Sequence, residues 1–169
     1  GSAANTLSIQ LSIQMTALTL TAGSGSGAFA EISASGGLLS IDGAGPILLT
    51  GGTNTNTQAQ IITRTAVRTT ATDVIHIGQI TPPTSITLLG NTGASSQAFI
   101  VSDQGGNIVS DVTGLYTITG GIGTTDARAG IYSGFTGGTS TGSGNIDLSG
   151  SGFLLTGGAS GAGTKVAEI

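Results

Sequence analysis

The chain has 169 residues and a formal net charge of −4, with 31 Gly, no Cys, no Trp, and only 7% charged and 4% aromatic residues. This composition excludes disulfide cross-links and thiolate metal sites, and four Lys plus Arg residues are too few for the basic track that a nucleic-acid backbone requires. Disorder is disfavoured because 37% of the residues are apolar and recur in phase, and no apolar run is long enough to predict membrane insertion.

Residues 1–17 contain an alternating apolar and polar segment at 7–14, which predicts a strand in an incomplete first coil. Complete coils are expected at 18–46, 47–85, 86–115 and 116–152, and 153–169 is expected to form an incomplete last coil. Each begins with two apolar residues separated by one residue and followed by a Gly- or Asn-containing turn, at 18–23, 47–52, 86–91, 116–121 and 153–158. Short and long coils alternate, so 1–169 is predicted to be one solenoid domain.

A second strand follows each first strand and carries the motif Ala-x-Ile. The motif ends at Ile32, Ile61, Ile100, Ile131 and Ile169, at intervals of 29, 39, 31 and 38 residues. Two markers that recur in step at such intervals indicate a repeat architecture built from strands.

A third strand is predicted at 38–42, 74–77, 107–111 and 145–149, which resemble the alternating segment at 7–14. The extra residues of the long coils fall at 63–72 and 133–143, between the second and third strands. We expect them to form loops or small side sheets on one flank.

Equivalent strands of successive coils are expected to stack as parallel ladders. The fold class is therefore all-β, a parallel β-helix of about five coils with three short strands each. The inward core columns are predicted to contain Ile32, Ile61, Ile100, Ile131 and Ile169; Leu20, Leu49, Leu88, Ile118 and Leu155; and Leu18, Ile47, Ile86, Tyr116 and Phe153. A column of Ala residues should run beside the Ile column.

Candidate chemistry is sparse. His76 is the only His, and its neighbour Asp73 would face the opposite side of a strand, so we interpret His76 as an outward, solvated residue. Asp42, Asp111 and Asp147 occupy comparable third-strand positions and could form a surface row. No calcium repeat or phosphate loop is present, and the acids are too scattered for polysaccharide cleavage. We therefore predict no catalytic, cofactor-binding or metal-ligating residue, no cofactor, and no enzyme activity.

Threonine pairs on the first strand are the one pattern typical of a binding face. Thr19 with Thr21 and Thr117 with Thr119 would face outward, as in an ice-binding array. Leu interrupts the array in three of the five coils, and the β-propensity of Thr explains the pairs without a ligand.

The two ends of the chain are complementary. The chain starts on a third-type strand and stops on a second-type strand, so a following copy would supply the missing strand. Two readings stay open: a segment of a longer solenoid, or copies that polymerise end on end.

The repeated Leu-Leu-Thr-Gly-Gly, Ala-x-Ile and Gly-Asn-Ile segments resemble the repeats of filamentous-haemagglutinin-like bacterial surface proteins, best at 47–61, 116–131 and 153–169. The resemblance implies a right-handed parallel β-helix, secretion from a Gram-negative bacterium, and an adhesive or fibre-forming role. It supplies no catalytic residues.

The leading hypothesis is a non-enzymatic extracellular or cell-surface structural protein, such as a fibre, adhesin or biofilm-matrix subunit. Its expected partners are further copies of itself and a host or neighbouring cell surface, with no nucleic acid and no membrane insertion. The alternatives are an ice- or glycan-binding module and a polysaccharide-active enzyme.

Overall fold

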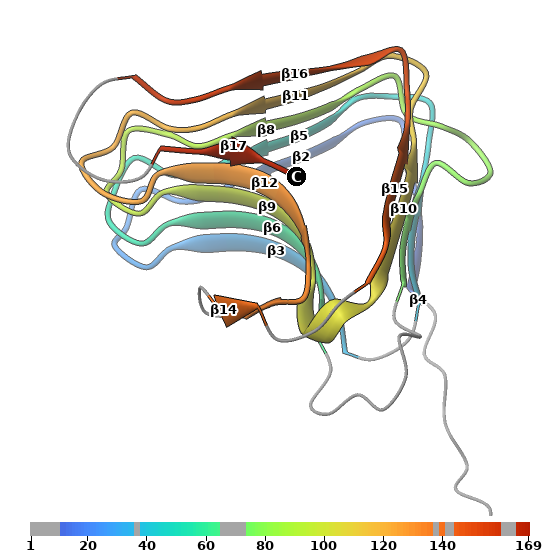
Figure 1. The fold of residues 1–169 in the computed structure, drawn as a ribbon, viewed down its shortest axis with the longest axis horizontal. Helices are drawn as coiled ribbons and strands as arrows, with labels where there is room; N and C mark the ends of the chain where they lie inside the picture. The colour runs from blue at the N-terminus through green and yellow to red at the C-terminus, as the bar shows by residue number, and fades with distance from the viewer. Residues whose placement is uncertain (1–10, 36–37, 65–73, 137–138, 141–143, 160–164) are drawn as a thin grey trace, which may run out of the picture.

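The computed structural model describes residues 11–35, 38–64, 74–136, 139–140, 144–159 and 165–169. These residues form an all-β parallel solenoid of about five coils and contain no α-helix. Figure 1 shows the stacked coils of the chain forming three walls around one interior, with equivalent strands of successive coils lying one beside the next.

Each wall is a five-stranded parallel sheet, and the three sheets are called A, B and C. Sheet A contains β1 (Leu11–Gln14), β4 (Leu38–Asp42), β7 (Val74–Ile77), β10 (Asn107–Asp111) and β15 (Ile146–Ser149). Sheet B contains β2 (Leu18–Thr21), β5 (Ile47–Thr50), β8 (Ile86–Leu89), β11 (Leu115–Thr119) and β16 (Gly152–Thr156). Sheet C contains β3 (Phe29–Ser35), β6 (Gln58–Arg64), β9 (Gln97–Ser102), β12 (Arg128–Ser133) and β17 (Ala167–Glu168).

The strand register aligns the predicted columns, except for Ile169, which no strand pairing includes. In sheet B, Leu20, Leu49, Leu88, Ile118 and Leu155 are successive partners, and so are Leu18, Ile47, Ile86, Tyr116 and Phe153. In sheet C, Ile32, Ile61, Ile100 and Ile131 are aligned, beside the column of Ala30, Ala59, Ala98, Ala129 and Ala167. Ile169 follows Glu168, the last paired residue of β17, and is 48% exposed.

The core is a narrow aliphatic interior enclosed by the three sheets. Inward residues of the middle coils, such as Ile61, Ile77 and Leu88, are completely buried. The same columns lose their cover at the last coil, where Phe153 is 47% and Leu155 44% exposed. Burial in this fold is thus provided by the neighbouring coils rather than by the coil itself.

Glycine occurs where stacked corners approach each other too closely for a side chain. A Cβ on Gly45, between sheets A and B, would lie 1.4 Å from the Thr16 carbonyl oxygen of the neighbouring coil. A Cβ on Gly121, between sheets B and C, would lie 2.3 Å from the Asn91 carbonyl oxygen. The glycine turns of the sequence therefore allow the corners to stack at the spacing of the sheets.

The long coils differ in part from the sequence prediction. The residues after Ser133 form a small antiparallel side sheet of β13 (Phe135–Thr136) and β14 (Thr139–Ser140), near η1 (Asp103–Gly105), as predicted for this flank. In the other long coil, β6 already includes residues 63 and 64, and 65–73 lie outside the described residues. Its extra length also includes an unpredicted loop at 78–85, between β7 and β8.

Replacement of one inward Leu by Ala should lower the free energy of unfolding by different amounts in the middle and at the end of the same column. We expect Leu88→Ala to lower the free energy of unfolding by about 3–5 kcal/mol, because it leaves a cavity in the core. Leu155→Ala, at a site that is already 44% exposed, should cost about 1 kcal/mol or less. Denaturant unfolding of both variants in dilute solution measures this, and equal losses would contradict the dependence of burial on neighbouring coils.

Candidate functional surfaces

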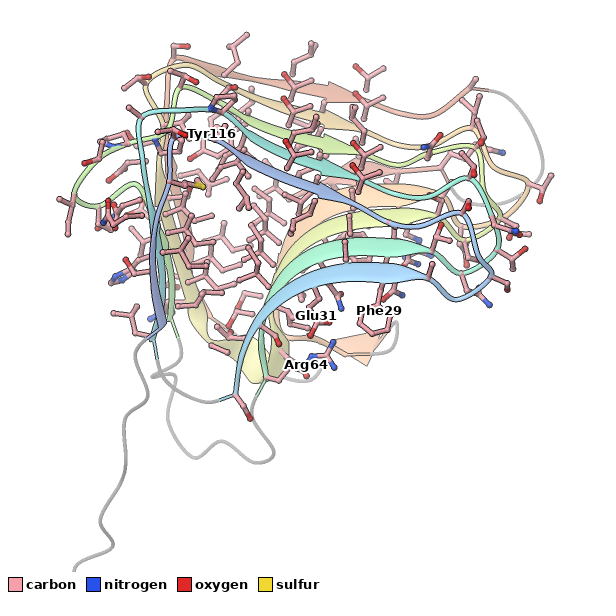
Figure 2. All side chains as sticks on the ribbon, turned by 180° about the vertical axis from the view of Figure 1, so that it is seen from behind. Phe29, Glu31, Arg64 and Tyr116 are labelled. Atoms are coloured by element: carbon pink, nitrogen blue, oxygen red, sulfur yellow. The ribbon has the colours of Figure 1, made fainter. Side chains whose placement is uncertain are left out.

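In one inward column, a polar interaction replaces an aliphatic contact. Tyr116 points inward from β11, and its hydroxyl lies 2.7 Å from the carbonyl oxygen and 2.9 Å from Oγ of Ser110, where other coils of that column have Ile or Leu (Figure 2). Phe153 stacks on the Tyr116 ring at 4.9 Å. Burial raises the pKa of the Tyr116 phenol to about 12, so it stays protonated and acts as a structural donor rather than an acid.

His76 is placed by its strand. Its neighbours Ile75 and Ile77 are completely buried, so His76 faces outward and is half-buried, between Ser40 and Val109 of the adjacent strands. Asp73, the partner considered in the sequence, lies outside the described residues. Within the described part of the chain, no three His, Cys, Asp or Glu side chains come together in a way that could hold a metal ion.

The predicted row of Asp42, Asp111 and Asp147 is wrong. Asp147 pairs with Val109, whereas Asp111 pairs with Ser149, so Asp147 lies two residues away from the column that contains Asp42 and Asp111. All three face outward, but Asp147 directly follows Ile146, whereas Asp111 comes three residues after Ile108, the partner of Ile146.

Asp42 instead fastens the loop at 78–85. Its Oδ1 accepts hydrogen bonds from the backbone N–H groups of Ile80 at 2.8 Å and Thr81 at 3.2 Å, and its Oδ2 lies 3.1 Å from Ser40 Oγ. Asp111 lies in the same column on β10, two strands from β4, and accepts a hydrogen bond from the Gln79 side chain at 2.9 Å. Two carboxylates on either side of β7 thus hold the start of this loop.

Removal of the Asp42 charge should loosen the loop in a pH-dependent way. Burial raises the pKa of the Asp42 carboxyl, but the hydrogen bonds from Ile80, Thr81 and Ser40, together with His76, outweigh it and hold the pKa below its usual value. The carboxylate therefore stabilises the fold above about pH 4, and this contribution is lost as the pH falls through the lowered pKa.

We expect Asp42→Asn to lower the free energy of unfolding at neutral pH by about 1–3 kcal/mol and to remove part of the acid dependence of the wild type. Thermal unfolding across the acid range measures both effects. Asp147→Asn, at an exposed site on the same sheet, is the control and should change neither. An unchanged acid profile in Asp42→Asn would contradict the assignment.

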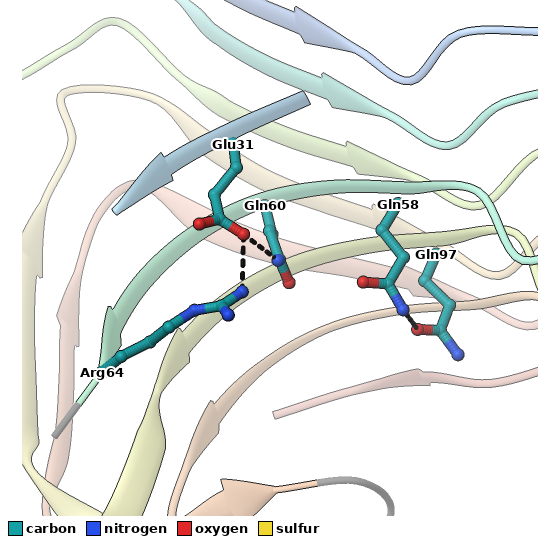
Figure 3. A network of polar contacts seen from close by, with 5 residues as sticks. All are labelled: Glu31, Gln58, Gln60, Arg64 and Gln97. Atoms are coloured by element: carbon teal, nitrogen blue, oxygen red, sulfur yellow. Dashed lines mark hydrogen bonds and ion pairs between the residues drawn. The ribbon is translucent and has the colours of Figure 1, made fainter. Parts of the chain in front are cut away.

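The outer face of sheet C carries paired polar side chains, shown in Figure 3. Glu31 accepts hydrogen bonds from Gln60 and from Arg64, the latter at 2.6 Å, and Gln58 donates to Gln97 at 3.0 Å. Each pair links neighbouring strands of the sheet. These contacts support strand stacking, and the exposed Glu31–Arg64 pair is of a kind that typically contributes less than about 1 kcal/mol.

Part of the same face is apolar and covered. Phe99 and Val101 point outward but are almost completely buried. Tyr132 packs edge-on against Phe99 with 5.0 Å between ring centroids, and its hydroxyl lies 2.6 Å from Glu168 Oε1. Burial and, as a smaller effect, the contact with Glu168 raise the pKa of the Tyr132 phenol. The aromatic pair therefore joins β9 to β12, and the Tyr132–Glu168 contact joins β12 to β17.

The outer face of sheet B is uncharged and open. Its outward residues form two columns in register across all five strands, which alternate with the inward columns, and Leu115 with Gly152 adds a shorter outward pair on the last two strands. The first column contains Thr19, Leu48, Thr87, Thr117 and Leu154, and the second contains Thr21, Thr50, Leu89, Thr119 and Thr156. The register confirms that Leu interrupts the threonine array in three coils.

The two end coils leave strand edges without a partner among the described residues. Strands β1, β2 and β3 lie at one end of the three sheets, and β15, β16 and β17 lie at the other. Inward residues at both ends, including Ile13 and Leu20 in the first coil and Leu155 in the last, are only partly covered. Among the described residues, each end is therefore an apolar cross-section surrounded by three backbone edges that have no paired strand.

No family model, no curated protein and no solved structure matches this chain. The described residues also include no helix long and apolar enough to cross a membrane. The surfaces that remain as candidates for function are the two coil ends and the Thr/Leu columns of sheet B.

Proposed function

We propose that this chain is a non-enzymatic structural element of an extracellular β-solenoid fibre or adhesin stalk, and that successive copies continue the coil head to tail. The observation that carries the proposal is the match between the two open ends. The resemblance to bacterial surface repeats supports the extracellular setting.

The register between copies follows from the register within the chain. A second copy placed at the last coil would stack its β1, β2 and β3 on β15, β16 and β17 of the first. Leu155 would then lie next to Leu20 of the second copy, and Ala167 next to Ala30, as in the existing columns. The junction would add three short ladders and bury inward residues that are 44–47% exposed, such as Leu155 and Phe153.

A charge inside the open end should block this growth. We expect Leu155→Lys to prevent or greatly shorten fibres, because the junction would bury an ammonium group against Leu20 of the next copy. The variant should fold normally, since Leu155 is 44% exposed and a Lys side chain can reach solvent there.

Negative-stain electron microscopy of the purified chain measures fibre length. Ser149→Lys, an outward and exposed substitution on the same last coil, is the matched control and should leave fibres intact. Wild-type protein that stays monomeric at high concentration would overturn the proposal, and fibres that form equally well with Leu155→Lys would overturn the junction.

The proposed register also places two carboxylates together. Glu31 and Glu168 occupy the same outward column, so Glu168 would face Glu31 of the next copy. Glu31 retains the Arg64 ion pair, and Glu168 the Tyr132 hydroxyl, which reduce but do not remove the repulsion.

Growth should therefore become faster from wild type to Glu168→Gln to Glu168→Lys, because repulsion is first removed and then replaced by attraction. Light scattering during assembly at low and high salt measures the order, and salt should reduce the differences. The same growth rate in all three proteins would indicate a different register at the junction.

A further inference from the structure

The five strands of sheet B contain no charged residue, and the Thr/Leu columns on their outer face are not covered by any described segment. Sheets A and C differ in this respect, because their outward residues include Asp42, Asp111, Glu31 and Arg64. A strand face without charges lacks the usual protection against association with another sheet.

The Thr and Leu residues are distributed so that no coil carries two large side chains on this face. The five coils carry Thr19 with Thr21, Leu48 with Thr50, Thr87 with Leu89, Thr117 with Thr119, and Leu154 with Thr156. Each Leu therefore has a smaller Thr beside it on the same strand.

We propose that this face is the lateral interface between two fibres, and that the occupant is the same face of a second copy of this chain. The inference rests on the proposed function, because the fibre supplies the length of the interface. The two copies are related by a two-fold axis parallel to the solenoid axis. This axis exchanges the two columns, so Leu48 lies opposite Thr50 of the second copy, and Leu89 lies opposite Thr87.

The opposite orientation fits less well when the central coils of the two copies are level. A two-fold axis along the strands would reverse the order of the coils and keep each column against itself. Leu89 of the central coil would then lie against Leu89 of the second copy, while Thr would face Thr elsewhere in that column. With the coils of the two copies level, the parallel arrangement places Leu48, Leu89 and Leu154 each opposite a Thr, which allows these side chains of one face to fill the spaces of the other.

The size of the face explains why pairing should depend on fibre growth. Five coils at about 4.8 Å and strands of about 15 Å give roughly 350 Å² per copy, against about 800 Å² per partner in a stable interface. Two or three copies joined end on end reach that area. A regular ice surface is a poorer match, because Leu48, Leu89 and Leu154 interrupt the threonine columns.

The test compares Thr87→Lys with Val109→Lys. Both add one Lys at a half-buried outward site away from the coil ends, the first on β8 of sheet B and the second on β10 of sheet A. Fibre length and the fraction of fibre length in side-by-side pairs are both measured by cryo-electron microscopy. Wild type and Val109→Lys should form paired fibres, and Thr87→Lys should reduce the paired fraction by at least about fivefold at unchanged fibre length, because pairing would bury its charge.

Single wild-type fibres, or pairing that survives in Thr87→Lys, would overturn this inference and leave the proposed function intact. No wild-type fibres at all would overturn both. Ice-recrystallisation inhibition, measured on the same samples, tests whether the face binds ice. If wild type inhibits recrystallisation without forming paired fibres, and Thr87→Lys abolishes the inhibition, the face would be assigned to ice binding instead.

Discussion

The parallel stacking of coils is the constraint on which the rest of the structure depends. Each strand forms its backbone hydrogen bonds with the coil before and the coil after it, and each inward side chain is covered by the same position in those coils. Because the spacing is set by the backbone at about 4.8 Å, a column tolerates little variation in side-chain size. This accounts for the nearly uniform Ile, Leu and Ala columns, and for glycine at corners where Gly45 and Gly121 approach the carbonyl groups of adjacent coils.

Exceptions to the aliphatic columns are compensated within the interior. The large Tyr116 ring is accommodated beside the small Ser110, and the same pair satisfies both hydroxyl groups, so a gain of volume in one column is matched by a loss in the facing one. Another inward column of sheet C contains the buried hydroxyls of Thr63 and Ser102, whose oxygens are 3.3 Å apart. Polar groups are thus accepted inside this solenoid when adjacent coils provide the partner.

The sequence was sufficient to predict the features that repeat. The period, the three strands per coil and the register of the Leu and Ile columns follow from local alternation, because an inward residue must be followed two positions later by another. Features that occur once were not predictable. The loop held by Asp42 depends on a contact across 38 residues, and the position of Asp147 depends on the alignment of Ser110 with Leu148. No periodic signal marks such contacts. The covered outward site of Phe99 likewise depends on its packing with Tyr132 from the next coil.

The same stacking rule links the two candidate surfaces to each other. A coil end is a ladder without its next strand, so end-on growth needs no new kind of contact and would convert partly exposed residues such as Leu155 into core residues. A lateral face gains nothing from a single copy, because its area grows only with the number of coils. If growth and pairing both occur, they are therefore ordered: the fibre lengthens first, and side-by-side association becomes favourable once enough uncharged face is aligned. In that case, the absence of charge on the strands of sheet B has a structural consequence only in the polymer.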